Sequence, residues 1–192
     1  MASRDRRSAY SLARREMKAG RQAYVVCPLR SGNSSDAYSA EEIYDMLTKG
    51  YFKNFSGALI HGKMKAAEKD DIMTRFKNGE IKYIVSTTVI EVGVNVPNAT
   101  VIVIEDAERF GLAQLHQLRG RVGRGSLQSY CILLSSSREK VARERLGLME
   151  KTTNGFELAE ADLKMRGPGQ FFGEKQFGMP DLKLGRVGKL LK

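Results

Sequence analysis

The sequence is poor in the residues that form disulfides and metal sites. Its 192 residues include only two cysteines and two histidines. Cys27 and Cys131 each lie in a short apolar stretch typical of a strand, so we expect two buried, reduced thiols rather than a disulfide. The cysteines and histidines are also scattered along the chain, without the close pairs that zinc sites use. The sequence therefore predicts neither a disulfide framework nor a zinc site.

Long apolar segments are absent as well. No apolar run approaches the roughly 20 residues that a transmembrane helix requires, and the basic first 21 residues lack the apolar segment of a secretory signal. No Ser/His/Asp or Cys/His set has the context for nucleophilic catalysis. A hydrophobic content of 42% and a charged content of 28% are typical of a folded globular protein. We therefore expect a cytoplasmic protein with no membrane partner.

The sequence also lacks a phosphate-binding loop, G-x-x-x-x-G-K-[ST], and an acidic pair after an apolar strand that would hold Mg²⁺. It nevertheless contains the stretch Gln117-Leu118-Arg119-Gly120-Arg121-Val122-Gly123-Arg124. Arginines behind glycines can project together into a cleft, where their planar, permanently charged forks bind phosphate oxygens. Phosphoryl-transfer enzymes use such arginines to stabilise charge on a γ-phosphate. The sequence therefore predicts half of a nucleotide site, completed by the parent polypeptide or a partner.

The formal net charge of +10 is concentrated at the two ends of the chain. Residues 1–30 carry a net charge of +6 and residues 164–192 carry +5, whereas residues 31–163 carry −1. A basic excess of this kind favours a polyanionic partner, most simply nucleic acid. A solvated basic surface is the alternative, and composition does not distinguish the two.

Strand and helix patterns alternate every 20 to 30 residues up to Ser135, which predicts an open, mostly parallel α/β sheet with flanking helices. After Ser137 we expect a helical hairpin and then a loop rich in glycine. The predicted domains are therefore 1–136 and 137–192. The expected strands are Ala23–Cys27, Ala58–Ile60, Tyr83–Ser86, Val101–Ile104 and Ser129–Leu134, and the expected helices are 5–19, 39–49, 65–77, 112–118, 138–150 and 155–164.

Polar side chains follow the expected second and third strands. Thr87 and Thr88 come after Ser86, with Gly93 and Asn95 further along, and His61 follows Ile60. Parallel sheets bind ligands at the carboxyl ends of their strands, and hydroxyls there can donate to the phosphates of a nucleic-acid backbone. The alternatives are a strand-to-helix turn with capping hydroxyls and a structural histidine. We expect His116, on the helix before the arginines, to pack or orient rather than to catalyse.

These stretches carry a resemblance to a known family. Ser86–Asn95 and Gln117–Arg124 resemble motifs V and VI of superfamily 2 helicases. Further segments resemble the RecG family of ATP-dependent DNA translocases, namely Tyr24–Leu29, His61–Met64, Glu105–Leu112 and Arg166–Gly169. The resemblance to this family extends from about Arg21 to Gly178. The resemblance implies that 1–136 is the second RecA-like motor domain and that 137–192 is the translocation motif with its hairpin, loop and tail.

The resemblance also implies roles for individual residues. Arg121 and Arg124 would reach the ATP phosphates, and Gln117 would couple nucleotide state to domain closure. Gly93 and Asn95 would lie at the nucleotide cleft. Thr87 and Thr88 would lie near the DNA backbone, and Arg145, Arg166 and Gln176 would transmit closure into DNA movement. Independently of the resemblance, His61 could contact a backbone phosphate from its place after the second strand.

As a whole, the resemblance implies the C-terminal motor half of a bacterial, nucleoid-associated enzyme that remodels stalled forks and Holliday junctions. ATP and Mg²⁺ would be held mainly by a first RecA-like domain, and the substrate would be branched double-stranded DNA worked against a wedge domain of the same polypeptide. This chain alone would then hydrolyse little or no ATP. The alternatives are a motor fragment of a transcription-repair coupling factor, which shares the translocation motif, and a non-catalytic DNA-binding module.

Overall fold

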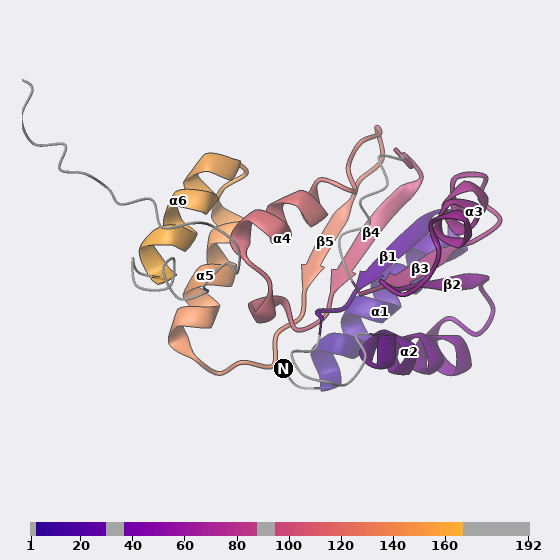
Figure 1. The fold of residues 1–192 in the computed structure, drawn as a ribbon, viewed down its shortest axis with the longest axis horizontal. Helices are drawn as coiled ribbons and strands as arrows, with labels where there is room; N and C mark the ends of the chain where they lie inside the picture. Colours follow the sequence, from indigo (N-terminus) through magenta and orange to yellow (C-terminus); the bar gives the residue numbers. More distant parts are fainter. Residues whose placement is uncertain (1–2, 30–36, 88–94, 167–192) are drawn as a thin grey trace, which may run out of the picture.

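The centre of the molecule is a parallel β-sheet (Figure 1). The computed structural model describes residues 3–29, 37–87 and 95–166. Its five strands are β1 (Gln22–Val26), β2 (Gly57–Ile60), β3 (Tyr83–Ser86), β4 (Ala99–Ile104) and β5 (Tyr130–Leu133). They lie in the order β2-β3-β1-β4-β5, and every neighbouring pair is parallel. The predicted α/β class and the five expected strands are confirmed.

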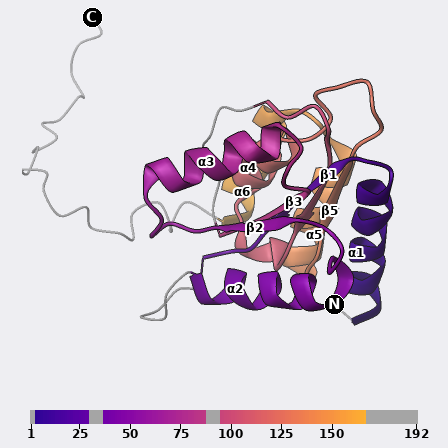
Figure 2. The same cartoon turned by 90° about the vertical axis from the view of Figure 1, so that its right-hand side faces the viewer.

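Helices cover both faces of this sheet. Helices α1 (Ser3–Lys18) and α2 (Ala37–Met46) lie on one face, and α3 (Ala66–Lys77) and α4 (Leu112–Arg119) lie on the other (Figure 2). Helix α2 continues as a π-helical turn, Leu47–Tyr51, and a 3₁₀ turn, Ala107–Arg109, links β4 to α4. Helices α5 (Lys140–Lys151) and α6 (Gly155–Arg166) follow β5 and form a hairpin beside α4. The expected hairpin is thus present, while the expected glycine-rich loop lies outside the described residues.

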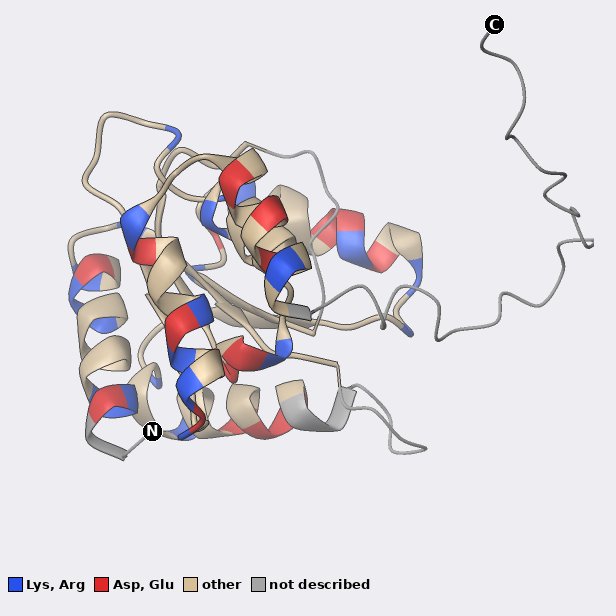
Figure 3. Ribbon diagram, turned by 90° about the vertical axis from the view of Figure 1, so that its left-hand side faces the viewer, with Lys and Arg blue, Asp and Glu red and all other residues tan. Residues whose placement is uncertain are grey.

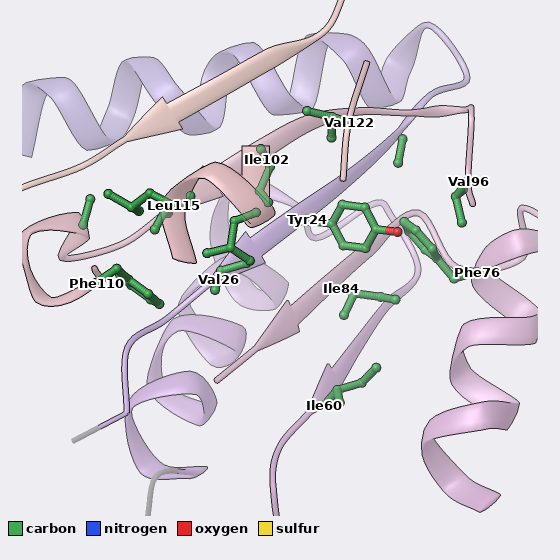
Figure 4. Packing of buried hydrophobic residues seen from close by; sticks show 14 of the residues in the cluster. Tyr24, Val26, Ile60, Phe76, Ile84, Val96, Ile102, Phe110, Leu115 and Val122 are labelled. Atoms are coloured by element: carbon green, nitrogen blue, oxygen red, sulfur yellow. The ribbon is translucent and has the colours of Figure 1, made fainter. Parts of the chain in front are cut away.

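Alternation of side chains along the strands produces two cores, because successive residues of a strand point to opposite faces. Tyr24, Ile84 and Ile102 point toward α3 and α4, where they meet Phe76 and Leu115 (Figure 4). The second cluster lies on the other face of the sheet. It contains the intervening strand residues Val25, Val85 and Val103, together with Tyr10 of α1, Leu47 of the π-helical turn and Phe52 just after that turn. A strand buried on both faces must be apolar throughout, which is why the strands read as continuous apolar runs.

A buried carboxylate fixes helix α1 to the sheet. Glu105 directly follows β4 and is only 2% exposed. Arg6 donates to it from Nη2 at 2.7 Å, and the Tyr10 hydroxyl donates to its other oxygen. Removing either donor would leave a charge buried with fewer partners, which is costly. Part of the basic N-terminal segment is therefore used for internal packing.

The hairpin shares the first core rather than standing apart from it. Met149 of α5 and Leu158 of α6 are 6% and 0% exposed and belong to the cluster that contains Tyr24. On the hairpin helices and on α1 and α3, basic and acidic residues are interspersed (Figure 3). Much of the basic C-terminal segment lies outside the described residues, so the charge prediction for that end stays a prediction.

Both cysteines carry free thiols. Cys27 is 1% exposed, and Cys131 is half-buried. Burial raises the pKa of the Cys131 thiol to about 11. Within the described ranges, no group of three His, Cys, Asp or Glu side chains could hold a metal ion. Within the same ranges, no helix has the length and apolar character needed to span a membrane.

Candidate functional site

Helix α4 and the loop after it hold the two arginines of the predicted nucleotide site. Leu112, Leu115 and Leu118 are at most 1% exposed and fix the inner face of α4, so Gln117 lies on the exposed face. We call residues 120–125 the arginine loop. Val122 is only 9% exposed and packs into the core, between the two arginines.

The backbone of the arginine loop turns where glycine permits it. Gly123 has φ +78°, a left-handed backbone conformation that residues other than glycine rarely adopt. Arg124 donates from Nε to the Gly120 carbonyl at 2.7 Å, which folds its side chain back over the loop. Arg121 is partly buried and Arg124 is exposed. A buried valine and a turning glycine therefore place two arginine side chains on one short loop.

The arginine loop lies at the amino ends of the strands. A Cβ built on Gly125 would lie 3.4 Å from the carbonyl oxygen of Pro97, two residues before β4 begins. Figure 4 shows Val96 and Val122 at the same end of the cluster, near the Tyr24 ring. Burial raises the pKa of the Tyr24 phenol to about 12, while the charges of Arg121 and Arg124 act in the opposite direction.

Asn95 lies near the arginine loop, because it stands just before Val96 and Pro97 in the sequence, and it is exposed. The structure therefore brings Asn95 toward the end of the sheet that carries both arginines.

His61 and Thr87 follow neighbouring strands at the opposite end of the sheet. The preceding residues, Ile60 and Ser86, are register partners at the carboxyl ends of β2 and β3, and the Thr87 amide donates to the Ile60 carbonyl at 3.3 Å. Thr87 is fully buried. Its Oγ1 and the Nδ1 of His61 are both buried, and within the described ranges neither has a hydrogen-bond partner. Buried polar atoms without partners cost free energy, so this end of the sheet is a candidate place for a ligand with phosphate oxygens.

Arg145 attaches the hairpin to the turn between β4 and α4. Its Nη2 donates to the carbonyls of Glu108 and Phe110, the latter at 3.0 Å. The Glu108 carboxylate accepts from the amides of Ser136 and Ser137 at 3.2 Å each, just before α5. Burial alone would raise the pKa of Glu108, but hydrogen bonds from its own backbone and from the serines hold that pKa below its ordinary value. Arg145 therefore fixes helix α5 to the turn between β4 and α4.

Sequence reasoning assigned no role to Arg119, which makes a second attachment. Its Nη1 donates to the carbonyls of Met149 at 2.8 Å and Thr152 at 3.0 Å, where α5 ends. Its Nη2 lies 2.9 Å from Nδ1 of His116. The expectation that His116 packs or orients is consistent with this contact. No local sequence signal marks Arg119, because its partners are backbone carbonyls about thirty residues away.

Four predicted site residues have no described side-chain surroundings. Gly93, Thr88 and Gln176 lie outside the described residues, and Arg166 is the last residue of α6, with only its backbone described. The roles assigned to these residues stay predictions. The described candidates form three separate groups, at the arginine loop, at the His61–Thr87 corner and in the hairpin.

Comparisons with known proteins identify the family of the chain. Residues 7–126 match the helicase conserved C-terminal domain family. Residues 152–192 match the C-terminal part of domain 3 of the ATP-dependent DNA helicase RecG. The chain is 53% identical to the ATP-dependent DNA helicase RecG of Synechocystis over 185 residues, which is 96% of this chain and 22% of that protein. The RecG of Bacillus subtilis is 52% identical over 88% of this chain and 25% of its own length.

Solved structures give the same result. A structure of RecG bound to a three-way DNA junction matches with a TM-score of 0.74 and 46% identity, over 88% of this chain and 22% of that one. Dbp5 of S. cerevisiae matches with a TM-score of 0.52 and 15% identity, over 83% of this chain and 42% of that one, and shows the shared fold alone. The chain spans about a quarter of the length of the RecG relatives that it matches. It therefore belongs to the family of helicase conserved C-terminal domains and resembles the C-terminal part of RecG.

Proposed function

We propose that this chain is the C-terminal motor half of a RecG-type ATP-dependent translocase that moves on double-stranded DNA and remodels stalled forks and Holliday junctions. The observation that carries the proposal is the arginine loop, which presents Arg121 and Arg124 on a RecG-like domain that has no phosphate loop of its own. The relative whose structure was solved on a three-way junction supports branched DNA as the substrate.

The arginine loop would act on a nucleotide held mainly by a first motor domain. The donor set fits ATP, because two guanidiniums on one loop offer planar forks to the phosphate oxygens. When bound with Mg²⁺, ATP supplies the phosphoryl group whose transfer to water releases the free energy for movement. Arg121 and Arg124 would stabilise the negative charge that develops on the γ-phosphate. The exposed Asn95 would line the same cleft, and the exposed Gln117 would couple nucleotide state to domain closure.

The His61–Thr87 corner would hold the DNA backbone. The Thr87 hydroxyl and Nδ1 of His61 are buried without partners among the described residues, and a phosphate oxygen that reached them would satisfy both. Contacts of this kind carry no sequence preference, as expected for an enzyme that translocates along any duplex. Thr88 would extend the contact, and Gly93 would let the opposite domain approach.

The hairpin would convert domain closure into DNA movement against a wedge domain of the same polypeptide. Arg145 holds α5 on the turn after β4, and Arg166 and Gln176 would continue the connection toward the DNA. On this proposal the translocation segment is 137–192. If Gln176→Ala in the full-length protein left fork unwinding intact, Gln176 would have no part in coupling.

The proposal also implies that the chain alone hydrolyses little or no ATP, because its arginines act on a nucleotide bound elsewhere. The test is to add the first motor domain in trans and to measure DNA-stimulated ATP hydrolysis. We expect neither part to hydrolyse ATP rapidly alone and the mixture to do so. A mixture as inactive as its parts, with both folded and bound to each other, would contradict the proposal and favour a non-catalytic DNA-binding module. Stimulation by RNA polymerase, without activity on junctions, would favour a transcription-repair coupling factor.

A further inference from the structure

Helix α4 and the hairpin meet at a joint made by three residues, Arg119, His116 and Gly155. We propose that Arg119 is a positioning residue that carries movement of the arginine loop into the hairpin and thereby couples ATP hydrolysis to DNA movement. The inference rests on the function proposed above and deepens it by naming the connection between the arginine loop and the hairpin.

The guanidinium of Arg119 binds the end of helix α5. Its Nη1 lies 2.8 Å from the carbonyl oxygen of Met149 and 3.0 Å from that of Thr152. The last carbonyls of a helix lack partners within the helix and carry partial negative charge, so a cation is favoured there. Because one nitrogen serves both carbonyls, Arg119 fixes the position of the C-terminal end of α5 relative to α4.

His116 extends the joint to helix α6. Arginine can only donate, so the 2.9 Å contact from Nη2 of Arg119 requires Nδ1 of His116 to accept and the ring proton to lie on Nε2. A Cβ built on Gly155, the first residue of α6, would lie 2.9 Å from this Nε2. That distance is too short for a carbon–nitrogen contact, so a side chain at position 155 would displace the His116 ring or helix α6. Glycine therefore allows the close packing of the two helices.

The joint is continuous with the arginine loop. The Arg121 amide donates to the Leu118 carbonyl at 3.0 Å, and the Gly120 amide donates to the His116 carbonyl at 3.1 Å. These bonds join the loop to the last turn of α4, so a displacement of Arg121 toward a phosphate also displaces Arg119.

The hairpin is held at a second point by Arg145, which binds the turn between β4 and α4. Arg145 lies near the middle of α5, whereas Arg119 binds its C-terminal end. Movement at Arg119 with Arg145 fixed would therefore rotate the hairpin instead of shifting it as a whole. Such a rotation would carry a displacement at the nucleotide to the opposite end of the hairpin.

The test uses the full-length protein and compares junction unwinding with DNA-stimulated ATP hydrolysis. Arg119→Met keeps the aliphatic stem and removes every donor. We expect unwinding of a three-way junction to fall at least about tenfold while ATP hydrolysis stays within about twofold, which corresponds to about 1.4 kcal/mol of lost coupling. Arg119→Lys restores a cation and should recover part of the unwinding. Arg75→Met is the matched control, because Arg75 pairs with Asp71 and Glu80 on and just after α3, away from the joint.

Gly155→Ala opens the same joint from α6 and tests the inference where Arg119→Met fails to fold. We expect it to reduce unwinding per ATP hydrolysed, and the double variant to be less impaired than the product of the two single effects, because both break one connection. Equal losses of hydrolysis and unwinding in each variant, or unwinding at the level of the Arg75→Met control, would overturn the inference. A wild-type protein without DNA-stimulated hydrolysis or junction unwinding would instead refute the proposed function.

Discussion

Replacing Arg145 with methionine should loosen the hairpin and leave the sheet intact. The side chain donates to the carbonyls of Glu108 and Phe110 and is only half-buried. A hydrogen bond from a charged donor contributes about 1.5–3 kcal/mol when buried. Allowing for solvent around this guanidinium, we take about 2 kcal/mol for both contacts together, which is about a 30-fold change in an equilibrium constant.

Hydrogen exchange of the backbone amides in the isolated chain measures this effect, because it reports the free energy of local opening. Amides of α5 and α6 should lose about 30-fold of their protection in Arg145→Met, and amides of β1, β3 and β4 should keep theirs. The control is Arg143→Met, two residues along the same helix, because Arg143 donates to the carbonyl of Arg138 just before α5. Unchanged protection in the hairpin, or an equal loss in the sheet, would refute the reasoning.

Two further predictions concern stability. Gly57→Ala should lower the melting temperature, because a Cβ there would lie 2.5 Å from Cε1 of the buried Tyr83 ring. Phe52 packs against that ring at a centroid distance of 4.9 Å and holds it in place. Overpacking of this kind costs about 1–3 kcal/mol, and each kcal/mol lowers the melting temperature of a domain of this size by roughly 2–4 °C. Gly50→Ala is its control, since a Cβ there meets nothing within 4 Å, and equal melting temperatures for the two variants would count against this packing. The free energy of unfolding should also fall as the pH rises from about 9 to about 12. Folding raises the pKa of Cys131 from 9.0 to about 11 and the pKa of Tyr24 from 10.0 to about 12. The unfolded chain therefore releases these protons at lower pH than the folded chain, which favours unfolding as the pH rises. Urea denaturation across this range measures the slope, and a flat profile up to pH 12 would contradict it.

Most of the fold could be predicted from the sequence because its signals are local. Continuous apolar runs mark strands that are buried on both faces, and the spacing of Leu112, Leu115 and Leu118 marks the inner face of α4. The two glycines around Arg121 could likewise be recognised as a turn. These patterns depend on neighbours in the sequence and on the periods of helix and strand.

The contacts that organise the site depend on distant parts of the chain and could not be predicted in this way. Glu105 resembles an exposed residue at a strand end, yet Arg6, 99 residues earlier, makes its burial possible. Arg119 binds carbonyl oxygens, which every residue carries and which no sequence pattern distinguishes. Sequence reasoning also directed attention to the carboxyl ends of the strands, whereas the arginine loop lies at their amino ends.

We propose above that the arginine loop stabilises charge on a nucleotide bound by another domain. The most direct test is DNA-stimulated ATP hydrolysis by the full-length protein carrying Arg124→Ala, with Arg75→Met as the control. We predict that kcat falls by about 10³-fold, a typical contribution of such an arginine, while a fluorescent ATP analogue still binds. Hydrolysis at the rate of the control would contradict it.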